Sequence, residues 1–363
     1  MKRIFAILLL LGLLLTGCKQ PVDDGPSTES STEATQATQQ QVTENTQVTE
    51  TTQKEILYRH PLTGEPLDKP WSGQITAVMI NNLKKAMPQR GIAAADIFYE
   101  IEVEGDITRC LAVYSDLTKA TVIGPVRSAR TVFNSVAVSY DAPLVHCGGS
   151  PGLALAGRYG SSYDVIENWQ HIDQAHNDKY FFRDMDRYNS GYAWEHTLFT
   201  KGESLQKAIT DKGYNTPDTK AYGLQFTEDV TLNGEKATQI TIKFKSGKTT
   251  IVNYDAENKH YTLNIHGTTH IDGNTEEPVT FQNVIAIYAN QYYAPNGMHK
   301  FYDSIGTGDG YAAINGEIVK IKWSRESLRS PYTYTLEDGT PLTLETGHTY
   351  IALVGIKNQL TYK

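Results

Sequence analysis

Hydrophobic positions follow three different patterns along the chain. An uninterrupted apolar run covers residues 4–15, whereas residues 19–54 are mostly Thr, Gln, Ser and Glu with no aromatic side chain. From residue 55 onwards, short apolar runs alternate with polar turns, as in a chain that buries a core. The pattern therefore predicts a leader, a polar linker and a globular part over residues 55–363.

The first half of the globular part, residues 55–215, is predicted to be a mixed α/β domain. Residues 95–104 alternate at period two, which places Glu100, Glu102 and Glu104 on one face of a strand. Ser128 and Ser150 each precede a predicted helix and are expected to cap it. The predicted elements are strands over 74–81, 95–104, 107–114 and 143–147, and helices over 131–140, from 150 onwards and over 200–212.

The second half, residues 221–363, is predicted to be β-rich. Turn pairs such as Asn315-Gly316 and Asp338-Gly339 separate its apolar runs. The predicted strands cover residues 238–244, 249–254, 259–266, 279–289, 300–303, 310–314, 317–323, 332–336 and 350–354. The expected fold class is therefore α+β, with an α/β N-terminal domain followed by a β-rich C-terminal domain.

The N-terminal apolar run has the features of a lipoprotein signal. Lys2 and Arg3 precede it, and it is shorter than the roughly 20 apolar residues that span a bilayer. It ends in Leu15-Thr16-Gly17-Cys18, where small residues would admit a signal peptidase. We expect residues 1–17 to be removed and the Cys18 thiol to be acylated, so that membrane lipid anchors the protein at the extracytoplasmic face. An ordinary secretory leader with a chance cysteine is the alternative.

The composition of residues 18–54 predicts a tether, and the net charge of the chain argues against one class of partner. Residues 18–54 cannot bury enough apolar surface to offset their ordering entropy, so we expect a disordered tether. The chain carries a formal net charge of -8, and removal of Lys2 and Arg3 with the leader makes it more negative. Such an acidic exported protein is not expected to bind nucleic acid.

Candidate chemistry is concentrated at the two junctions before the predicted helices. Helix N-termini offer unpaired N–H groups, arginines lie beside the first junction, and a glycine pair at the second permits close approach of a ligand. An anionic or polar ligand site is predicted there, with two glutamates orienting the arginines. The predicted residues are Arg127, Ser128, Arg130, His146, Gly148, Gly149, Ser150, Glu100 and Glu104. Alternatively, both junctions are only capped helices whose arginines pair with the glutamates.

Other groups allow alternative interpretations. The series from Glu100 to Asp106 could supply metal ligands or an acid/base pair if it faces the same cleft, but its plainer interpretation is the solvated face of a hairpin. His146 could act as a base, or it could be structural. The Glu195-His196 loop is expected to form local ion pairs unless His196 converges on His146.

Metal and redox chemistry have little support in the sequence. Cys110 and Cys147 lie in predicted strands and could form a disulfide or remain free thiols. His260, His266 and His270 lack a completing cysteine or carboxylate pattern, so we expect neither metal nor cofactor. Common hydrolase signatures are absent from the sequence, which leaves enzymatic activity open.

Several segments carry specific motifs beyond strand and helix patterns. In the first half they are Leu62-Thr-Gly64, Ala77-Val-Met-Ile-Asn-Asn82, Ala95 to Gly105, Ile107-Thr-Arg109, Ile123-Gly-Pro-Val-Arg-Ser-Ala-Arg130 and His146-Cys-Gly-Gly-Ser-Pro151. In the second half they are Gly306-x-Gly308, Asn315-Gly316, Trp323-Ser-Arg325, Asp338-Gly339 and Leu344-x-x-Gly347. Together they resemble the YerB-like family of bacterial lipoproteins.

The resemblance implies a lipid-anchored extracytoplasmic protein in two domains of unknown function. Two positions depart from the family pattern, because Glu195-His196-Thr197 stands where Pro-His-Asn is expected and Cys110 replaces an aromatic residue. We therefore expect a membrane-anchored lipoprotein that binds an anionic or polar ligand of the cell envelope, such as a cell-wall fragment. The alternatives are a hydrolase or transferase acting on a cell-wall polymer, and a scaffold that recruits envelope proteins.

Overall fold

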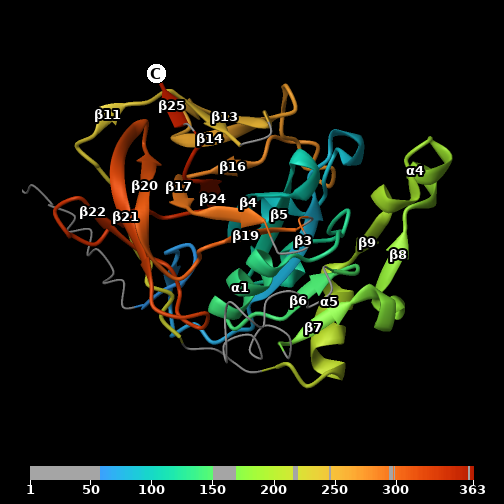
Figure 1. Cartoon of the computed structure of the whole chain (residues 1–363). Helices are drawn as coiled ribbons and strands as arrows, with labels where there is room; N and C mark the ends of the chain where they lie inside the picture. The colour runs from blue at the N-terminus through green and yellow to red at the C-terminus, as the bar shows by residue number, and fades with distance from the viewer. Residues whose placement is uncertain are drawn as a thin grey trace, which may run out of the picture. The chain divides into compact units, whose positions relative to one another are not determined.

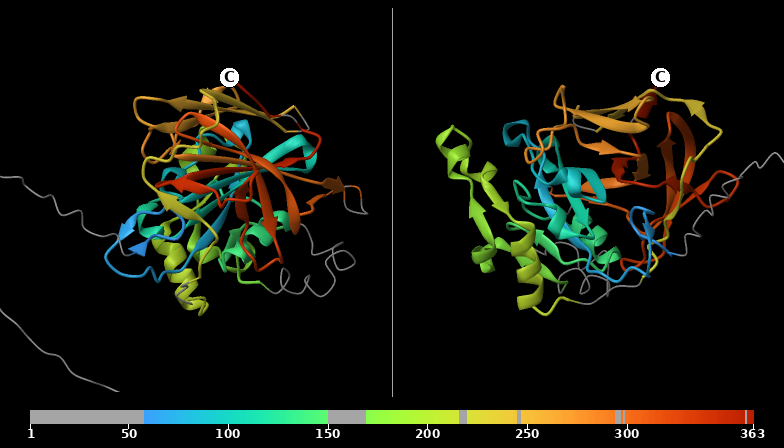
Figure 2. Two further views of the ribbon diagram at one scale, coloured as in Figure 1. Left: turned by 90° about the vertical axis from the view of Figure 1, so that its left-hand side faces the viewer. Right: turned by 180° about the vertical axis from the view of Figure 1, so that it is seen from behind.

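The computed structural model describes residues 58–149, 169–215, 220–244, 247–293, 297, 299–358 and 360–363. The predicted leader, the tether, acylation at Cys18 and the helix predicted from Ser150 lie outside these residues. Residues 54–363 form one compact unit, which Figures 1 and 2 show from three sides. Within the described ranges, no helix has both the length and the apolar character needed to cross a membrane.

The largest sheet has eleven strands and includes strands from both halves of the sequence. Its order is β11-β21-β20-β17-β24-β4-β5-β3-β6-β7, and β22 also pairs with β21. The strands are β3 (Thr76–Asn81), β4 (Ile97–Val103), β5 (Ile107–Tyr114), β6 (Leu144–His146), β7 (His171–Asp173), β11 (Glu235–Lys236), β17 (Asn283–Ala289), β20 (Gly306–Ile314), β21 (Glu317–Arg325), β22 (Thr333–Leu336) and β24 (Thr349–Gly355).

The two halves of the sequence meet inside this sheet. Strand β24 from the second half pairs in parallel with β4 from the first, from Thr349 opposite Ile97 to Leu353 opposite Ile101. Strand β24 also pairs in parallel with β17 along its whole length. The predicted domains are therefore joined by backbone hydrogen bonds between strands as well as by the chain between them.

A second sheet of six strands comes wholly from the second half. Its path is β15-β14-β13-β12-β25, and β16 pairs with β14. The strands are β12 (Gln239–Lys243), β13 (Thr249–Asp255), β14 (His260–Ile265), β15 (Thr268–Thr269), β16 (Thr280–Phe281) and β25 (Leu360–Tyr362). In β12, β13 and β14 buried and less buried positions alternate, as expected for strands with one face on a core.

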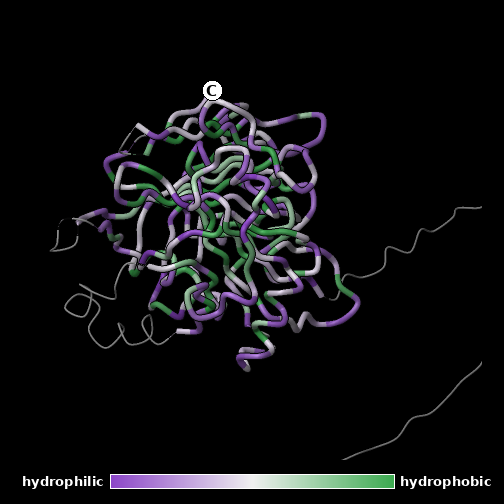
Figure 3. The backbone as a smooth tube through the Cα atoms, turned by 90° about the vertical axis from the view of Figure 1, so that its right-hand side faces the viewer, coloured by the Kyte–Doolittle hydropathy of each residue, from purple (hydrophilic) through white to green (hydrophobic). Residues whose placement is uncertain are grey.

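Buried hydrophobic residues lie on both faces of the large sheet. Figure 3 shows hydrophobic segments, in green, towards the inside of the backbone trace. On one face, residues such as Phe98 and Tyr350 pack against the six-stranded sheet through Ile242 and Val252. On the other face, alternate residues of the same strands pack against Phe133 and Val136 of a helix. Period-two alternation of buried strands thus supplies two separate cores.

That helix is α1 (Thr131–Ser139), which confirms the helix predicted over 131–140. The predicted helix over 200–212 is α5 (Gly202–Asp211), and the hairpin of β4 and β5 is also confirmed, with the short helix η3 (Glu104–Asp106) at its turn. The α/β description of the first half is not confirmed, because the described chain as a whole is strand-rich and the longest strands of the first half, β3, β4 and β5, belong to a sheet shared with the second half.

Smaller elements complete the described chain. An arm of the first half, seen at the right of Figure 1, contains β8 (Phe181–Arg183), α4 (Met185–Asn189), η9 (Trp194–His196) and β9 (Leu198–Thr200). The other short elements are β1 (Tyr58–Arg59), β2 (Pro66–Leu67), η1 (Lys84–Ala86), η2 (Ile92–Ala94), η4 (Leu117–Lys119), η7 (Gln174–His176), η8 (Asp178–Tyr180), β10 (Gln225–Thr227), β18 (Gln291–Tyr293), β19 (Lys300–Tyr302) and β23 (Thr343–Glu345).

Candidate functional site

An arginine cluster lies where the β4–β5 turn meets the segment before α1. Glu104 belongs to that turn, and Arg109 is the third residue of β5. The segment before α1 runs beside β3, because the backbone N–H of Arg127 donates to the carbonyl of Met79 over 3.1 Å. The sheet thus brings together arginines that are 21 or fewer positions apart in the chain but belong to different elements.

Three guanidinium groups of this cluster share two carboxylates. Arg130 pairs with Glu104, and Arg109 Nη2 lies 3.9 Å from the same carboxylate. Arg127 Nη2 lies 3.2 Å from Glu195 Oε2. We use the term arginine cluster for these five residues, whose formal charges leave one positive charge uncompensated.

Burial makes the uncompensated positive charge of this cluster energetically unfavourable. Arg109 is only 6% exposed, and its Nη1 donates to the carbonyl of Ser128 over 2.5 Å. Burial, together with the neighbouring Arg130, lowers the pKa of Arg109 to about 9. Burial opposes ionisation of Glu104, but the hydrogen bond and charge of Arg130, a backbone hydrogen bond and the charge of Arg109 together outweigh it and lower the pKa of Glu104.

Two polar atoms at the centre of the cluster have no partner. Within the part of the chain that the structure describes, Arg109 Nε and Glu104 Oε2 are buried without a hydrogen bond. Most buried polar atoms in folded proteins are paired, so an open donor on a charged side chain needs an explanation. An anion that accepts from Arg109 and its neighbours would provide one.

The second predicted junction lies beside the first. The backbone N–H of Ala129 donates to the carbonyl of Gly148 over 3.0 Å, and Gly149 forms an isolated bridge with Ala129. Gly148 has φ +67°, a conformation that glycine adopts without strain, and a Cβ there would lie 3.9 Å from Ser128 Oγ. Ser150 lies outside the described residues.

His146 takes part in a local network at this junction. Its Nδ1 donates to the carbonyl of Gly148 over 2.8 Å, and its Nε2 faces His171 Nδ1 at 3.0 Å. Burial lowers the pKa of His146, although Asp173 at 3.7 Å acts in the opposite direction. The backbone N–H of Gly148 donates to Asp173 Oδ1 over 2.9 Å, so this amide is already engaged.

Two sequence expectations about this region need correction. Ser128 does not cap α1, because the N-cap is Arg130 and no side chain accepts a hydrogen bond there. Cys110 and Cys147 are both free thiols, so the disulfide alternative is wrong. Strand β3 lies between β5, which carries Cys110, and β6, which precedes Cys147.

Glu100 does not contact the arginines. It is fully buried on the face of β4 that packs against the six-stranded sheet, so the solvated hairpin face is also wrong for this residue. Its carboxylate accepts four hydrogen bonds of 2.6–2.9 Å, from Asn82, Thr108, Thr250 and Tyr350. Four donors satisfy a buried carboxylate without a cation, which explains why Glu100 orients none of the arginines.

Comparison with known protein families identifies the family of this chain. The family described as protein of unknown function (DUF3048) matches through its N-terminal domain at residues 62–215 and its C-terminal domain at residues 240–351. The chain belongs to the DUF3048 family.

A relative and a solved structure agree with this assignment. The relative is named "Putative lipoprotein YerB" of Bacillus subtilis, and it is 28% identical over 298 residues, 81% of this chain and 85% of the relative. The crystal structure of YerB protein from Bacillus subtilis matches with a TM-score of 0.69 and 26% identity, covering 84% of this chain and 99% of that one. The expected family membership is therefore confirmed.

The arginine cluster lies entirely within the N-terminal DUF3048 domain. Glu195, at a position where the sequence analysis expected proline, supplies the partner of Arg127. His196 Nδ1 faces Asn81 Nδ2 at 3.0 Å, and burial lowers the pKa of His196. No hydrogen bond or ion pair joins His196 to His146 within the described ranges, so these two histidines do not form one site.

Arg109 is the arginine of this DUF3048 site that the sequence analysis missed. In β5 it shares its strand face with Leu111 and Val113, which are fully buried. A charged residue in an otherwise apolar row was the signal. The signal was incomplete because an arginine there could equally pair with a glutamate of the neighbouring strand.

Proposed function

We propose that this DUF3048 protein is an exported lipoprotein that binds an anionic group of the cell envelope in its arginine cluster. The leader ending at Cys18 and the name of the Bacillus subtilis relative support acylation and an extracytoplasmic position. The proposed ligand group is a phosphate or a carboxylate of a cell-wall fragment. Guanidinium groups bind both through charge-assisted hydrogen bonds.

The environment of Arg109 carries this proposal. A 6% exposed guanidinium has two arginines as neighbours, shares its closest carboxylate with Arg130, and keeps a buried Nε without a partner among the described residues. A bound anion would compensate the charge and accept from the open donor. The side chains of Arg127 and Glu104 are 24% and 23% exposed, so the cluster can be reached from solvent.

Alanine variants of the two partly buried arginines, Arg127 and Arg130, test the proposal. Arg127→Ala should weaken binding of poly(glycerol phosphate) or muropeptides by about tenfold, the effect of losing one charge-assisted hydrogen bond. Binding by the unchanged protein should weaken as salt is added. The measurement is isothermal titration of the full chain, and Arg329→Ala, which removes a 58% exposed arginine elsewhere, is the control. The site would be rejected if Arg127→Ala and Arg130→Ala both bound these ligands with the affinity of the unchanged protein.

An enzymatic role receives less support from this geometry. The runner-up hypothesis requires His146 to work with a glutamate, yet in the described chain the ion-pair partner of His146 is Asp173. Glu100 lies on the other side of the sheet, where its hydrogen bonds are satisfied within the core. The binding proposal therefore uses more of the observed contacts than the catalytic one.

A further inference from the structure

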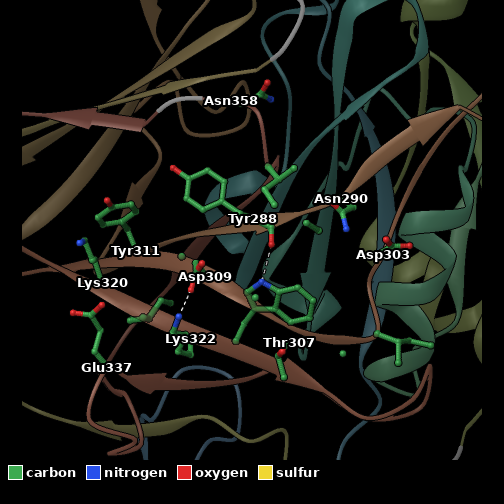
Figure 4. A pocket seen from close by; sticks show the side chains of 18 residues that line it. Tyr288, Asn290, Asp303, Thr307, Asp309, Tyr311, Lys320, Lys322, Glu337 and Asn358 are labelled. Atoms are coloured by element: carbon green, nitrogen blue, oxygen red, sulfur yellow. Dashed lines mark hydrogen bonds and ion pairs between the residues drawn. The ribbon is translucent and has the colours of Figure 1, made fainter.

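A long groove crosses the second half of the molecule, at the opposite end of the large sheet from the arginine cluster. Its central cavity of about 860 Å³ lies over β20 and β21 (Figure 4). A cavity of about 600 Å³ adjoins it and shares Tyr311, Lys320 and Glu337. A third, of about 570 Å³, shares Asn290, Asp303, Ile356 and Asn358. The shared walls make one continuous groove.

Tyrosines lie along the whole length of this groove, which we call the tyrosine groove. Tyr288 and Tyr311 line the centre with ring centroids 6.4 Å apart, and Tyr311 continues to Tyr362 at 6.2 Å. At the far end Tyr293 is 48% exposed. Aromatic rings with hydroxyl groups offer a flat apolar surface and a hydrogen-bonding edge together.

Polar groups with opposite charges lie between these rings. Asp309 and Lys322 form an ion pair across β20 and β21, and the side chains are 71% and 56% exposed. Figure 4 shows Lys320 and Glu337 towards one end of the central cavity and Asn290 and Asp303 towards the other. Such groups can donate to and accept from hydroxyl groups along an extended ligand.

One polar atom of a residue that lines two of the cavities is buried without a hydrogen-bond partner among the described residues. Among the described residues, Asn358 Nδ2 has no hydrogen-bond partner, and Asn358 lines both the central and the third cavity. An open amide donor beside aromatic rings favours a ligand that carries oxygen acceptors.

The charges of the groove argue against an anionic polymer, and the strand pairing beside it argues against a peptide that binds by strand addition. Five carboxylates and three lysines line the three cavities, so an anionic polymer would be repelled. An extended peptide that binds by strand addition needs a free sheet edge. The outer edge of β21 already pairs with β11 and β22, which leaves a peptide few backbone groups to bind.

We propose that the tyrosine groove binds an uncharged glycan chain. The apolar C–H faces of the sugar rings would stack on the tyrosines, and the hydroxyls would exchange hydrogen bonds with Asp309, Lys322 and Asn358. This second site is independent of the arginine cluster. It gives the chain one site for neutral sugar rings and another for anionic groups.

Titration of the full chain with neutral oligosaccharides tests the proposal. The probes are the hexamers of N-acetylglucosamine and of β-1,4-linked glucose. Tyr293→Ala should weaken binding by about threefold to tenfold, the worth of one aromatic contact. Tyr311→Ala should weaken it at least as much, with urea unfolding to verify that this variant is folded. Tyr188→Ala is the matched control, because Tyr188 is 46% exposed on α4, away from the groove.

Further binding measurements distinguish the tyrosine groove from the arginine cluster. Arg127→Ala should bind the hexamers with unchanged affinity, so the two proposals can fail separately. Absence of binding by both hexamers would overturn the glycan assignment, as would equal affinity of Tyr293→Ala, Tyr311→Ala and the unchanged protein. Binding of poly(glycerol phosphate) or of a cell-wall stem peptide that Tyr293→Ala abolishes would also overturn it.

Discussion

At the scale of single residues, the buried charged groups of this chain differ in how they are compensated. Glu102 pairs with Lys300 in the core, whereas Glu100 is satisfied by four neutral donors. Arg109 keeps an open donor among the described residues. A buried charge with complete partners indicates a structural role, and one with an open donor indicates a ligand. This contrast separates the arginine cluster from Glu100 and Glu102, whereas buried Arg187 also keeps an unpartnered Nη1 among the described residues.

His270 predicts a pH dependence of stability. It is 3% exposed and packs on Phe98, and neither ring nitrogen has a partner among the described residues. Burial, with Lys248 and His266 nearby, lowers the pKa of His270 from 6.5 to about 3. The unfolded chain therefore binds a proton below about pH 6.5 that the folded chain does not. Stability should be full above that pH and fall as the pH decreases towards 3.

Urea unfolding between pH 7.5 and 4 measures this effect. His270→Phe should reduce the slope of unfolding free energy against pH by up to about 1.4 kcal/mol per pH unit, the value for one proton. Other buried histidines contribute to the slope in both proteins, so the difference between them is informative. His176→Phe replaces a histidine whose side chain is 83% exposed, and it should leave the slope unchanged. Equal slopes for His270→Phe and the unchanged protein would contradict the prediction.

At the scale of elements, one buried arginine links α1 to β21 through hydrogen bonds. Arg325 is 1% exposed, and its guanidinium donates to Ser135 Oγ, to the carbonyl of Ser135 and to three other carbonyls. Its ring neighbour is Tyr332, 4.9 Å from the guanidinium carbon. Helix α1 comes from the first half and β21 from the second, so this side chain links elements that are far apart in the sequence.

Replacement of Arg325 should therefore be costly. Arg325→Met leaves several buried oxygens without a donor and should lower the free energy of unfolding by about 3 kcal/mol. Arg329→Met, at a 58% exposed side chain nearby, should change it by less than about 0.5 kcal/mol. Both values come from urea unfolding followed by circular dichroism. A loss below 1 kcal/mol in Arg325→Met would show that relaxed packing or water replaces these hydrogen bonds.

At the scale of the whole globular unit, the shared sheet couples the two halves. The parallel pairing of β24 with β4 places a strand of the C-terminal DUF3048 domain beside one of the N-terminal domain. The two proposed sites lie towards opposite ends of this sheet, near β20 and β21 and near β3, β5 and β6. A ligand long enough to reach both would contact both domains.

We expect the two halves to unfold together. The chain has four tryptophans, of which Trp71 reports on the first half and buried Trp323 on the second. Variants that keep only one of these two should show the same urea midpoint by fluorescence, because separation of β24 from β4 exposes both cores. Clearly different midpoints, or a far-ultraviolet transition with two steps, would contradict this coupling.

Local pattern was enough to predict many elements and the family, because apolar alternation and turn residues act over a few positions. Strand β5, helix α1 and most strands of the second half follow from it. The pairing of β24 with β4, the burial of Glu100 and the contact of Arg109 with Glu104 depend on residues brought together only by folding. A glutamate in an alternating strand has the same pattern whether its face meets water or a second sheet, so only the tertiary structure separates these cases.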